Sequence, residues 1–262
     1  GLGGRYITAE DVGTSIKDMD YVRMETKYVT GISKSLGGSG DPSLLTAFGT
    51  YLGIKASVKF KLNKNSLNGL SIAVQGLGSV GMELVKYLEN DGMKIYAYDI
   101  DNKLIEIAKK QYGVIPISDD MIYDKDVDIY APCALGATIN DDTIPRLKCS
   151  IIAGAANNVL KDPNKHSKEL LSKGILYAPD YAINAGGLIN VYNELEDYNK
   201  DRAFSQAEGI YDILMDIFYR SDKEGIPTTI ASDRKAEERI NKISSLKSFY
   251  LPNRRKTFLK GR

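Results

Sequence analysis

The chain has little of several things that would point to a particular chemistry: its 262 residues include one histidine and two cysteines, and its net charge is only +1. So small a charge provides no basic surface of the kind that attracts nucleic acid or a membrane. No apolar run approaches the roughly eighteen residues of a membrane-spanning helix, and no secretory signal pattern is recognisable. We therefore expect a cytoplasmic protein that binds neither nucleic acid nor membranes.

The scarcity of histidine and cysteine excludes further classes of protein. Cys133 and Cys149 lie in apolar, strand-like surroundings without the spacing of metal ligands, so we expect neither a metal site nor a disulfide. The single histidine, His166, stands in the polar stretch 164–168 and is predicted to be exposed. We reject it as a catalytic base, which excludes Ser-His hydrolases and histidine-dependent hydroxy-acid dehydrogenases.

What the sequence does contain is a dinucleotide-binding fingerprint in its full setting. A glycine-rich loop follows the strand-like run 71–75 and opens a helical pattern at 80–88. Gly76 permits a tight turn, Gly78 lets the backbone approach a pyrophosphate, and Gly81 lets helix and strand pack closely. The N–H groups at the start of the helix then face the phosphates. The whole loop consists of Gly76, Leu77, Gly78, Ser79, Val80 and Gly81.

An acidic residue completes the fingerprint. A second strand-like run, 94–98, ends at Asp99, which lies 18 residues beyond Gly81. A carboxylate at this place accepts hydrogen bonds from the adenosine ribose and repels a 2′-phosphate. The sequence therefore predicts NAD rather than NADP as the cofactor, and we include the next residue, Ile100, in the binding site.

From residue 70 the chain alternates between strand-like and helical patterns. This alternation predicts an α/β fold, a Rossmann-type doubly wound parallel sheet with helices on both faces. Helical extensions are expected on both its N-terminal and C-terminal sides. Ligands should bind at the carboxyl ends of the strands. The strands are expected at 71–75, 94–98, 127–131, 150–154 and 175–178.

Two helix starts are predicted ahead of the sheet. Thr8 is a suitable N-cap for a short helix beginning at 9–11. Asp41 is expected to cap a long helix, with Pro42 in its first position, where a missing N–H costs nothing.

The chain beyond residue 182 is predicted to be helical. Gly225 ends one long helix, and another runs to about Ile243. The tail from Ser244 carries basic residues without acids and is expected to be solvated or to contact a neighbouring subunit. The first of these helices has an apolar stripe, expected in the core or an interface; it consists of Ala207, Ile210, Tyr211, Leu214, Ile217 and Phe218.

Clusters of small and polar residues follow three successive strands, at 132–138, 153–158 and 177–187. Small residues let the backbone approach a flat ligand, and asparagine side chains can pair with a carboxamide. Each cluster alone is typical of a tight turn, but their recurrence at successive strand ends favours a ligand site. Asp11 is the best candidate acid–base group, although the residues alone leave open a simple interaction with a helix dipole.

Together these segments resemble the glutamate/leucine/phenylalanine/valine family of amino-acid dehydrogenases, and its leucine-specific members most closely. The resemblance implies NAD-dependent oxidative deamination of an L-amino acid to a 2-keto acid and ammonia, the reverse reaction, and a symmetric homo-oligomer. It extends over nearly the whole chain, through the stretches 4–14, 28–33, 128–141, 152–158 and 177–187.

The resemblance also implies roles for individual residues. Asp11 would be the catalytic carboxylate that moves protons to and from the amino group. Further cofactor contacts are implied for Thr46, Cys133, Ala134, Asn158 and Asn184, of which the threonine and the two asparagines hold the nicotinamide end. The substrate side chain would be lined by uncharged residues, which suit an aliphatic side chain better than glutamate. Such a pocket separates leucine, valine and isoleucine by only ~1–3 kcal/mol. Its residues are Ala9, Thr30, Leu188 and Val191.

Two departures from the family qualify this interpretation. The family carries a substrate domain whose glycine-rich loop ends in a catalytic lysine, and the chain resembles the family only downstream of that loop. We therefore expect a fragment that binds NAD but turns over little substrate by itself. Its parts are predicted to be a remnant of the substrate domain at 1–40, an NAD-binding domain at 41–185, and helices with a basic tail at 186–262.

The second departure concerns the substrate. Leu188, and Gly81 where leucine enzymes commonly carry alanine, favour the phenylalanine enzymes. Phenylalanine therefore stays open as a substrate, and a non-catalytic NAD-binding module stays open as an alternative function.

Overall fold

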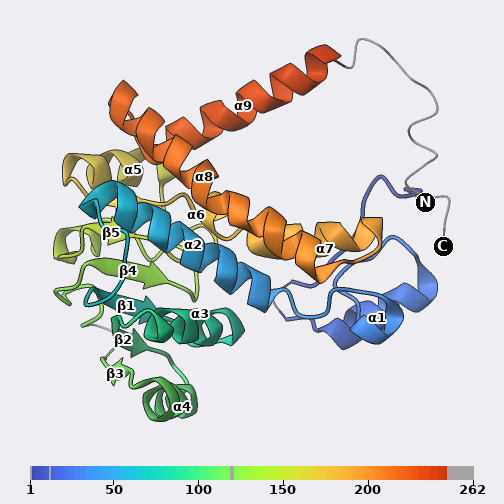
Figure 1. Ribbon diagram of the computed structural model, residues 1–262, viewed down its shortest axis with the longest axis horizontal. Coiled ribbons are helices and arrows are strands. Elements are labelled where there is room, and N and C mark those ends of the chain that lie inside the picture. The colour runs from blue at the N-terminus through green and yellow to red at the C-terminus, as the bar shows by residue number, and fades with distance from the viewer. Residues whose placement is uncertain (1, 12, 119–120, 247–262) are drawn as a thin grey trace.

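A computed structural model describes residues 2–11, 13–118 and 121–246, and within them a six-stranded parallel sheet has the order β3-β2-β1-β4-β5-β6 (Figure 1). The order reverses between β1 and β4, which confirms the predicted Rossmann-type doubly wound fold. The strands are β1 (Ser71–Gln75), β2 (Lys94–Tyr98), β3 (Ile115–Pro116), β4 (Ile129–Pro132), β5 (Ile151–Ile152) and β6 (Leu176–Tyr177).

Helices account for most of the remaining described chain. The α-helices are α1 (Ile16–Glu25), α2 (Ser43–Leu62), α3 (Ser79–Asn90), α4 (Asn102–Tyr112), α5 (Pro163–Ser172), α6 (Asp180–Ile183), α7 (Gly186–Asn193), α8 (Lys200–Glu224) and α9 (Thr228–Leu246). Three short 3-10 helices are η1 (Lys34–Leu36), η2 (Ile144–Arg146) and η3 (Glu194–Glu196). Among the described residues, no helix has both the length and the apolar character that crossing a bilayer demands.

The first two strands end where the sequence predicts, and the later ones are shorter. β4 is shifted by one or two residues from the predicted 127–131, and β5 and β6 each pair over only two residues. We did not predict β3, whose residues Ile115 and Pro116 are both exposed at the sheet edge. The proline within the short apolar run 114–117 argues against a central strand and is tolerated here because β3 is an edge strand.

Alternate residues of the strands supply two separate apolar cores, one on each face of the sheet. Ile72 and Val74 belong to the core shared with α2, α3 and α8, whereas Ala73 faces the opposite core with Tyr130 and Ile152. This alternation follows from the period of two in a β-strand. We call the sheet with α2–α5 and α8 the sheet body.

Glycine allows α2 and α8 to approach each other closely. A Cβ on Gly49 would lie 2.6 Å from Ile210 Cδ1, and one on Gly53 would lie 2.8 Å from Leu214 Cδ1. Ile210 belongs to the predicted apolar stripe of α8, of which Ala207, Ile210, Leu214, Ile217 and Phe218 are buried. The stripe is therefore core, one of the two predicted alternatives.

Two predicted helix starts need correction. Thr8 caps no helix: it forms a parallel bridge with Val29, with Thr8 N–H donating to Tyr28 O (3.0 Å). The first helix begins at Ile16 instead, behind a Ser15–Asp18 capping box. Pairing with residues twenty positions away therefore overrides the local capping signal.

The long helix α2 begins one residue later than predicted. Its N-cap is Pro42, and Asp41 stands one position further out. The Asp41 carboxylate nevertheless accepts a hydrogen bond from Ser43 N–H at 2.8 Å, so it satisfies one of the free donors at the helix start.

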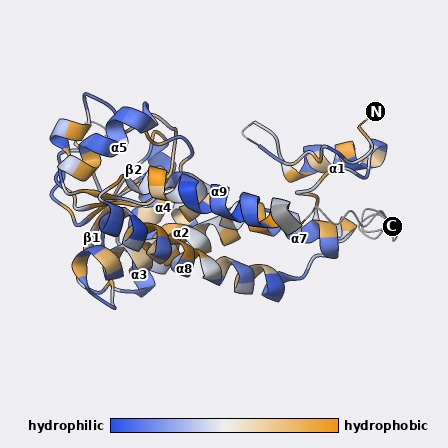
Figure 2. Ribbon diagram, turned by 90° about the horizontal axis from the view of Figure 1, so that it is seen from above, coloured by the Kyte–Doolittle hydropathy of each residue, from blue (hydrophilic) through white to orange (hydrophobic). Residues whose placement is uncertain are grey.

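The N-terminal segment, residues 2–11 and 13–40, lies apart from the strands. Both ribbon views place α1 at the opposite end of the molecule from the sheet (Figure 1, Figure 2). Its own apolar cluster is small, with Met19, Val29 and Ile32 buried and Val22 packed against them. The segment therefore has little core of its own.

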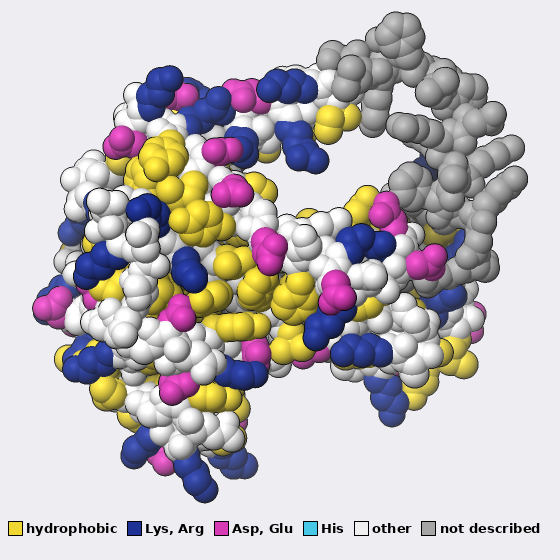
Figure 3. All heavy atoms as spheres, viewed as in Figure 1, with side chains coloured by type: hydrophobic (Ala, Val, Ile, Leu, Met, Phe, Trp, Pro, Cys, Tyr) yellow, Lys and Arg dark blue, Asp and Glu magenta, His cyan; other side chains and the backbone are white. Residues whose placement is uncertain are grey.

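The long helix α8 ends where the sequence predicts, and α9 follows it to Leu246, the last described residue. Gly225 caps α8 in the left-handed conformation, at φ +65°. On the face drawn in Figure 3, the far half of α9 stands clear of the sheet body, and Ile240 and Ile243 on it are exposed. The predicted basic tail, beyond residue 246, lies outside the described residues.

Candidate functional site

The three fingerprint glycines occupy three different environments. Gly76 has φ +102°, which only glycine adopts easily. A Cβ on Gly81 would lie 2.1 Å from Gly76 O, so helix α3 packs directly on the loop. Gly78, at the N-cap of α3, is exposed, and nothing lies within 4 Å of a Cβ built there. The loop thus leaves open space beside the helix start, where Ser79 and Val80 form the first turn and a pyrophosphate can approach.

Asp99 lies directly against this loop. Its Oδ2 accepts a hydrogen bond from Leu77 N–H at 2.6 Å, and its Oδ1 accepts one from Asp101 N–H at 2.8 Å. A carboxylate offers about four acceptor positions, so the two backbone donors fix its orientation and leave acceptors for ribose hydroxyls. The neighbouring Ile100 is 90% exposed and could cover an adenine ring.

The loop after β4 forms the other side of the glycine turn. A Cβ on Gly76 would lie 2.8 Å from both Cys133 O and Ala134 Cβ, and Cys133 N–H donates to Gln75 O at 2.7 Å. Burial raises the pKa of the Cys133 thiol to about 11. The thiol is therefore neutral at physiological pH, and this residue shapes the site through its backbone rather than through thiolate chemistry. Both cysteines are free.

Two asparagine side chains interact at the ends of β5 and β6. Asn184 Nδ2 donates to Asn157 Oδ1 at 2.5 Å and to Ala155 O at 3.2 Å. The predicted Asn158 is exposed and adopts φ +51°. Asn157, which we did not predict, thus orients the Asn184 carboxamide. The sequence places Asn157 and Asn158 in one cluster, but it does not show which of them contacts Asn184.

The start of α7 lies against the start of α2. A Cβ on Gly187 would lie 2.7 Å from Thr46 Oγ1, and one on Gly186 would lie 2.1 Å from Leu45 O. Thr46 Oγ1 donates to Pro42 O at 2.9 Å. The predicted nicotinamide residues therefore come from α2, from the loop after β5 and from the end of α6, near the carboxyl edge of the sheet.

The predicted acid–base group and substrate-pocket residues come from two regions. Asp11 is exposed in a turn closed by Thr14, whose hydroxyl donates to Asp11 O at 2.7 Å. Thr30 is buried beside Thr8, since Thr30 N–H donates to Thr8 O at 2.8 Å, and Ala9 follows as an exposed residue. On α7, Leu188 is 72% exposed and Val191 is half-buried one turn later, on the same helix face.

Glu10 is an unusual carboxyl that we did not predict from the sequence. Its Oε2 is buried and has no hydrogen-bond partner among the described residues. Burial and then the nearby carboxylates of Asp41 and Asp18 raise its pKa. A carboxyl group whose ionised form is disfavoured therefore directly precedes Asp11 in the chain.

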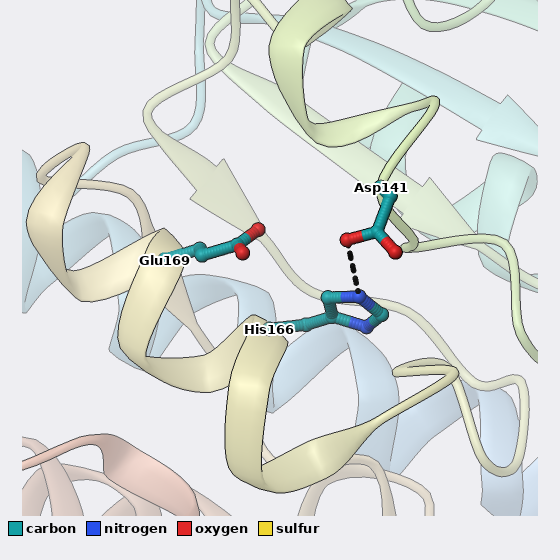
Figure 4. Close-up of side chains that lie close together, drawn as sticks. All are labelled: Asp141, His166 and Glu169. Carbon is teal, nitrogen blue, oxygen red and sulfur yellow. Dashed lines mark hydrogen bonds and ion pairs between the residues drawn. The ribbon is translucent and has the colours of Figure 1, made fainter.

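His166 is buried, which corrects the prediction that it is exposed (Figure 4). Its Nδ1 accepts a hydrogen bond from Asp162 N–H at 3.0 Å, and its Nε2 lies 3.4 Å from Asp141 Oδ1. It is one turn from the buried Leu170, so it lies on the inner face of α5.

The group formed by Asp141, His166 and Glu169 has metal-type donors within 4.8 Å of one another. Because His166 Nδ1 accepts a backbone N–H, the neutral ring carries its proton on Nε2, which then has no lone pair for a metal. The ammonium group of Lys165 also contacts the Asp141 carboxylate. These contacts favour a structural cap for α5 over a metal site.

Comparisons with known proteins identify the family of this chain. The model of the family "Glutamate/Leucine/Phenylalanine/Valine dehydrogenase" matches residues 98–235. The leucine dehydrogenase of Thermoactinomyces intermedius is 51% identical over 255 residues, which are 97% of this chain and 69% of that protein. The chain belongs to this dehydrogenase family. The predicted resemblance is thereby confirmed.

Solved structures of similar proteins agree with this membership. The L-tryptophan dehydrogenase of Nostoc punctiforme has a TM-score of 0.83 at 45% identity, covering 92% of this chain and 69% of that one. The hetero-hexameric glutamate dehydrogenase of Thermus thermophilus has a TM-score of 0.73 at 22% identity, covering 94% and 65%. The latter likeness concerns the fold alone. Within the family, the fingerprint loop and the asparagine cluster thus form the candidate site of a dehydrogenase.

Proposed function

We propose that this chain binds NAD and contributes to the oxidative deamination of a branched-chain L-amino acid. The reaction converts amino acid, NAD⁺ and water into 2-keto acid, ammonium, NADH and a proton. Leucine, valine and isoleucine are the substrates that we propose. The single observation that carries the cofactor assignment is the Asp99 carboxylate, held by Leu77 N–H at 2.6 Å beside the open space at Gly78. A carboxylate there accepts ribose hydroxyls and repels the extra phosphate of NADP.

When bound, NAD supplies the acceptor for the hydride that leaves the substrate Cα. The chain's own residues bind and orient the reactants. Thr46, Asn158 and Asn184 would hold the nicotinamide carboxamide through their polar side chains. Asp11 would take a proton from the substrate amino group and move protons on the carbinolamine that water forms from the imine. By the resemblance, turnover would further need the catalytic lysine of the family's glycine-rich loop.

The substrate assignment is supported by the uncharged character of four residues and by the similarity to leucine dehydrogenases. No charge among Ala9, Thr30, Leu188 and Val191 matches the second carboxylate of glutamate. An aromatic substrate is the second candidate. It is supported by the 72% exposure of Leu188, which leaves room for a larger side chain, and by the 46% identity to an L-tryptophan dehydrogenase of Nostoc punctiforme.

Two measurements test the proposal separately. NAD and NADP are titrated into the 262-residue chain by calorimetry, and tighter binding of NADP would overturn the role of Asp99. NADH formation is then followed with leucine, valine, phenylalanine and glutamate, using the chain extended by its upstream coding sequence. We expect the highest kcat/KM with a branched-chain substrate, and activity confined to glutamate would refute the pocket assignment. Asp11→Asn should remove most turnover without changing NAD affinity.

A homo-oligomer and a cytoplasmic location remain predictions. The first is measured by light scattering of the extended chain.

A further inference from the structure

Glu194 is a buried carboxylate that joins two distant parts of the chain. It is 6% exposed and opens η3 directly after α7. Both of its oxygens lie 3.0 Å from Gly31 N, which donates to them. Its Oε1 also accepts from Ser39 N–H at 2.8 Å and from the Ser39 hydroxyl. Donors that lie 155 and 163 residues away in sequence therefore converge on one side chain.

These contacts reach the proposed substrate pocket from both sides. Gly31 follows Thr30 directly, and Thr30 N–H donates to Thr8 O, just ahead of Ala9 and Asp11. On the other side, Glu194 ends the helix that carries Leu188 and Val191. The carboxylate thus connects the segment holding Thr30 to the helix holding the opposite pocket residues.

The chemistry of this contact makes it stiff. Burying a carboxylate is expensive unless hydrogen bonds compensate it, and hydrogen bonds to a charged acceptor are short and strong. An apolar residue at position 194 would leave two buried backbone N–H groups without acceptors. Gly31 itself adopts φ +75°, so its N–H direction is set by a turn that other residues tolerate poorly.

The N-terminal segment needs such a contact. Its apolar cluster of Met19, Val29 and Ile32 is separate from the two cores of the sheet body. Three buried side chains cannot by themselves hold a segment of this length in one orientation against the rest of the molecule. Directional hydrogen bonds then decide where Thr30 stands.

We propose that Glu194 is a positioning residue that fixes the distance between the Thr30 side and the α7 side of the substrate pocket. It does not contact the substrate. The proposal rests on the proposed function, because it takes Thr30, Leu188 and Val191 as pocket residues. Specificity for side-chain size would therefore depend on a carboxylate outside the pocket.

The test compares Glu194→Gln with Glu196→Gln in the extended chain. Glutamine keeps the volume but removes the charge that strengthens all of these bonds, and its NH2 group takes the place of the Oε2 that accepts from Gly31 N–H. Glu196 is exposed on the same 3-10 helix and serves as the matched control. Three quantities are measured: hydrogen exchange at the Gly31 and Ser39 amides, calorimetric affinity for NADH, and affinity of the NADH complex for 4-methyl-2-oxopentanoate.

We expect Glu194→Gln to speed exchange at Gly31 and Ser39 and to weaken keto-acid affinity, each by about tenfold, as the loss of one charged hydrogen bond implies. NADH affinity should stay within about twofold, and Glu196→Gln should change nothing. If Glu194→Gln does not fold, Ser39→Ala removes only the hydroxyl donor and should give smaller changes of the same kind.

Each contrary result has its own meaning. Unchanged hydrogen exchange at the Gly31 and Ser39 amides would show that Glu194 does not hold the N-terminal segment against α7. Faster exchange with unchanged keto-acid affinity would reduce Glu194 to structural support and overturn the positioning role. If the wild-type NADH complex binds no branched-chain or aromatic keto acid, the proposed function is wrong, and so is the positioning role of Glu194 in the substrate pocket. The exchange measurement would still test whether Glu194 holds the N-terminal segment against α7.

Discussion

The sheet body and the N-terminal segment are held together in different ways. In the sheet body, strands and helices bury apolar side chains on both faces of the sheet. In the N-terminal segment, three buried side chains form a cluster of their own, and hydrogen bonds from Gly31 and Ser39 to Glu194 connect it to α7. The cofactor half of the candidate site is thus set by packing, and the Asp11 half by a few polar contacts.

The magnitudes explain why this difference matters. A buried aliphatic side chain contributes about 1.5–3 kcal/mol, whereas ordering one residue of backbone costs about 1–2 kcal/mol. The many buried side chains of the sheet body offset that cost, but three in the N-terminal segment cannot. We therefore expect the segment carrying Asp11 to open before the rest of the site.

The largest effect is expected from Gly81→Val, which adds a side chain where α3 packs on the glycine loop. A Cβ here would lie 2.1 Å from Gly76 O, so even a methyl group requires the backbone to shift, and valine adds two further methyl groups. We expect a loss of stability of more than about 3 kcal/mol and no measurable NAD binding. Thermal unfolding measures the first quantity, and calorimetry measures the second.

Gly78→Ala is the matched control, because nothing lies within 4 Å of its added Cβ. It should keep the thermal midpoint and weaken only NAD. A thermal midpoint for Gly81→Val equal to that of wild type would contradict the packing of α3 on the loop.

A core truncation in each region tests the comparison directly. Met19→Ala should cost about 2–5 kcal/mol of local stability, and Leu84→Ala a similar amount of global stability. Both side chains are buried, Met19 in the N-terminal segment and Leu84 in the sheet body. We expect Met19→Ala to speed proteolysis before residue 40 while leaving the main thermal transition in place, and Leu84→Ala to lower that transition. Equal shifts of the main transition would show that the two regions unfold as one unit.

The sheet body was largely predictable because its signals are local. The run 71–75, the glycine loop and Asp99 lie within thirty residues of one another, and each glycine role follows from a backbone requirement there. His166 shows the limit of such arguments. Its polar neighbours suggested exposure, although its spacing of four from Leu170 was a usable sign of an inward helix face.

The N-terminal segment was less predictable because distant residues decide its structure. Thr8 has the chemistry of an N-cap, yet its bonds to the backbone at Tyr28 and Thr30 keep it extended. Glu194 is an ordinary acid in sequence, and only the folded chain brings Gly31 and Ser39 to it. Capping and periodicity describe neighbours in sequence, and they carry no information on contacts of this range.

A smaller effect is expected from Asp99→Asn, which changes the cofactor site and spares the packing. The asparagine oxygen can still accept from Leu77 N–H, so the glycine loop should keep its shape, and only the bond from Asp101 N–H is lost. Loss of the charge should weaken NAD about tenfold and bring NAD and NADP affinities closer together, since one charged hydrogen bond and one repulsion are removed.

Asp101→Asn, which alters the cap of α4 two residues later, is the control and should leave the NAD-to-NADP ratio unchanged. Calorimetric titration with both nucleotides measures this ratio. An unchanged preference in Asp99→Asn would remove the argument for NAD.

The smallest effect concerns Glu10, the carboxyl of the N-terminal segment whose pKa burial and the nearby Asp41 raise. A raised pKa in the folded protein means that this group favours folding below its ordinary pKa and disfavours it as pH rises through the raised value. Glu10→Gln cannot ionise, so at pH 7 it should stabilise the segment by up to about 1 kcal/mol. Below about pH 3, where Glu10 is protonated in both the folded and the unfolded chain, the difference should vanish.

Hydrogen exchange at the Thr8 and Thr30 amides, which hold the segment's bridge, measures this effect without requiring global unfolding. Protection in Glu10→Gln should exceed wild type by up to about fivefold at pH 7 and equal it at about pH 3. Glu25→Gln, at an exposed acid in the same segment, should change neither. Lower protection in Glu10→Gln at pH 7 would mean that the ionised carboxylate is stabilised, so that Glu10 would be one of the polar contacts holding the segment rather than a strain upon it.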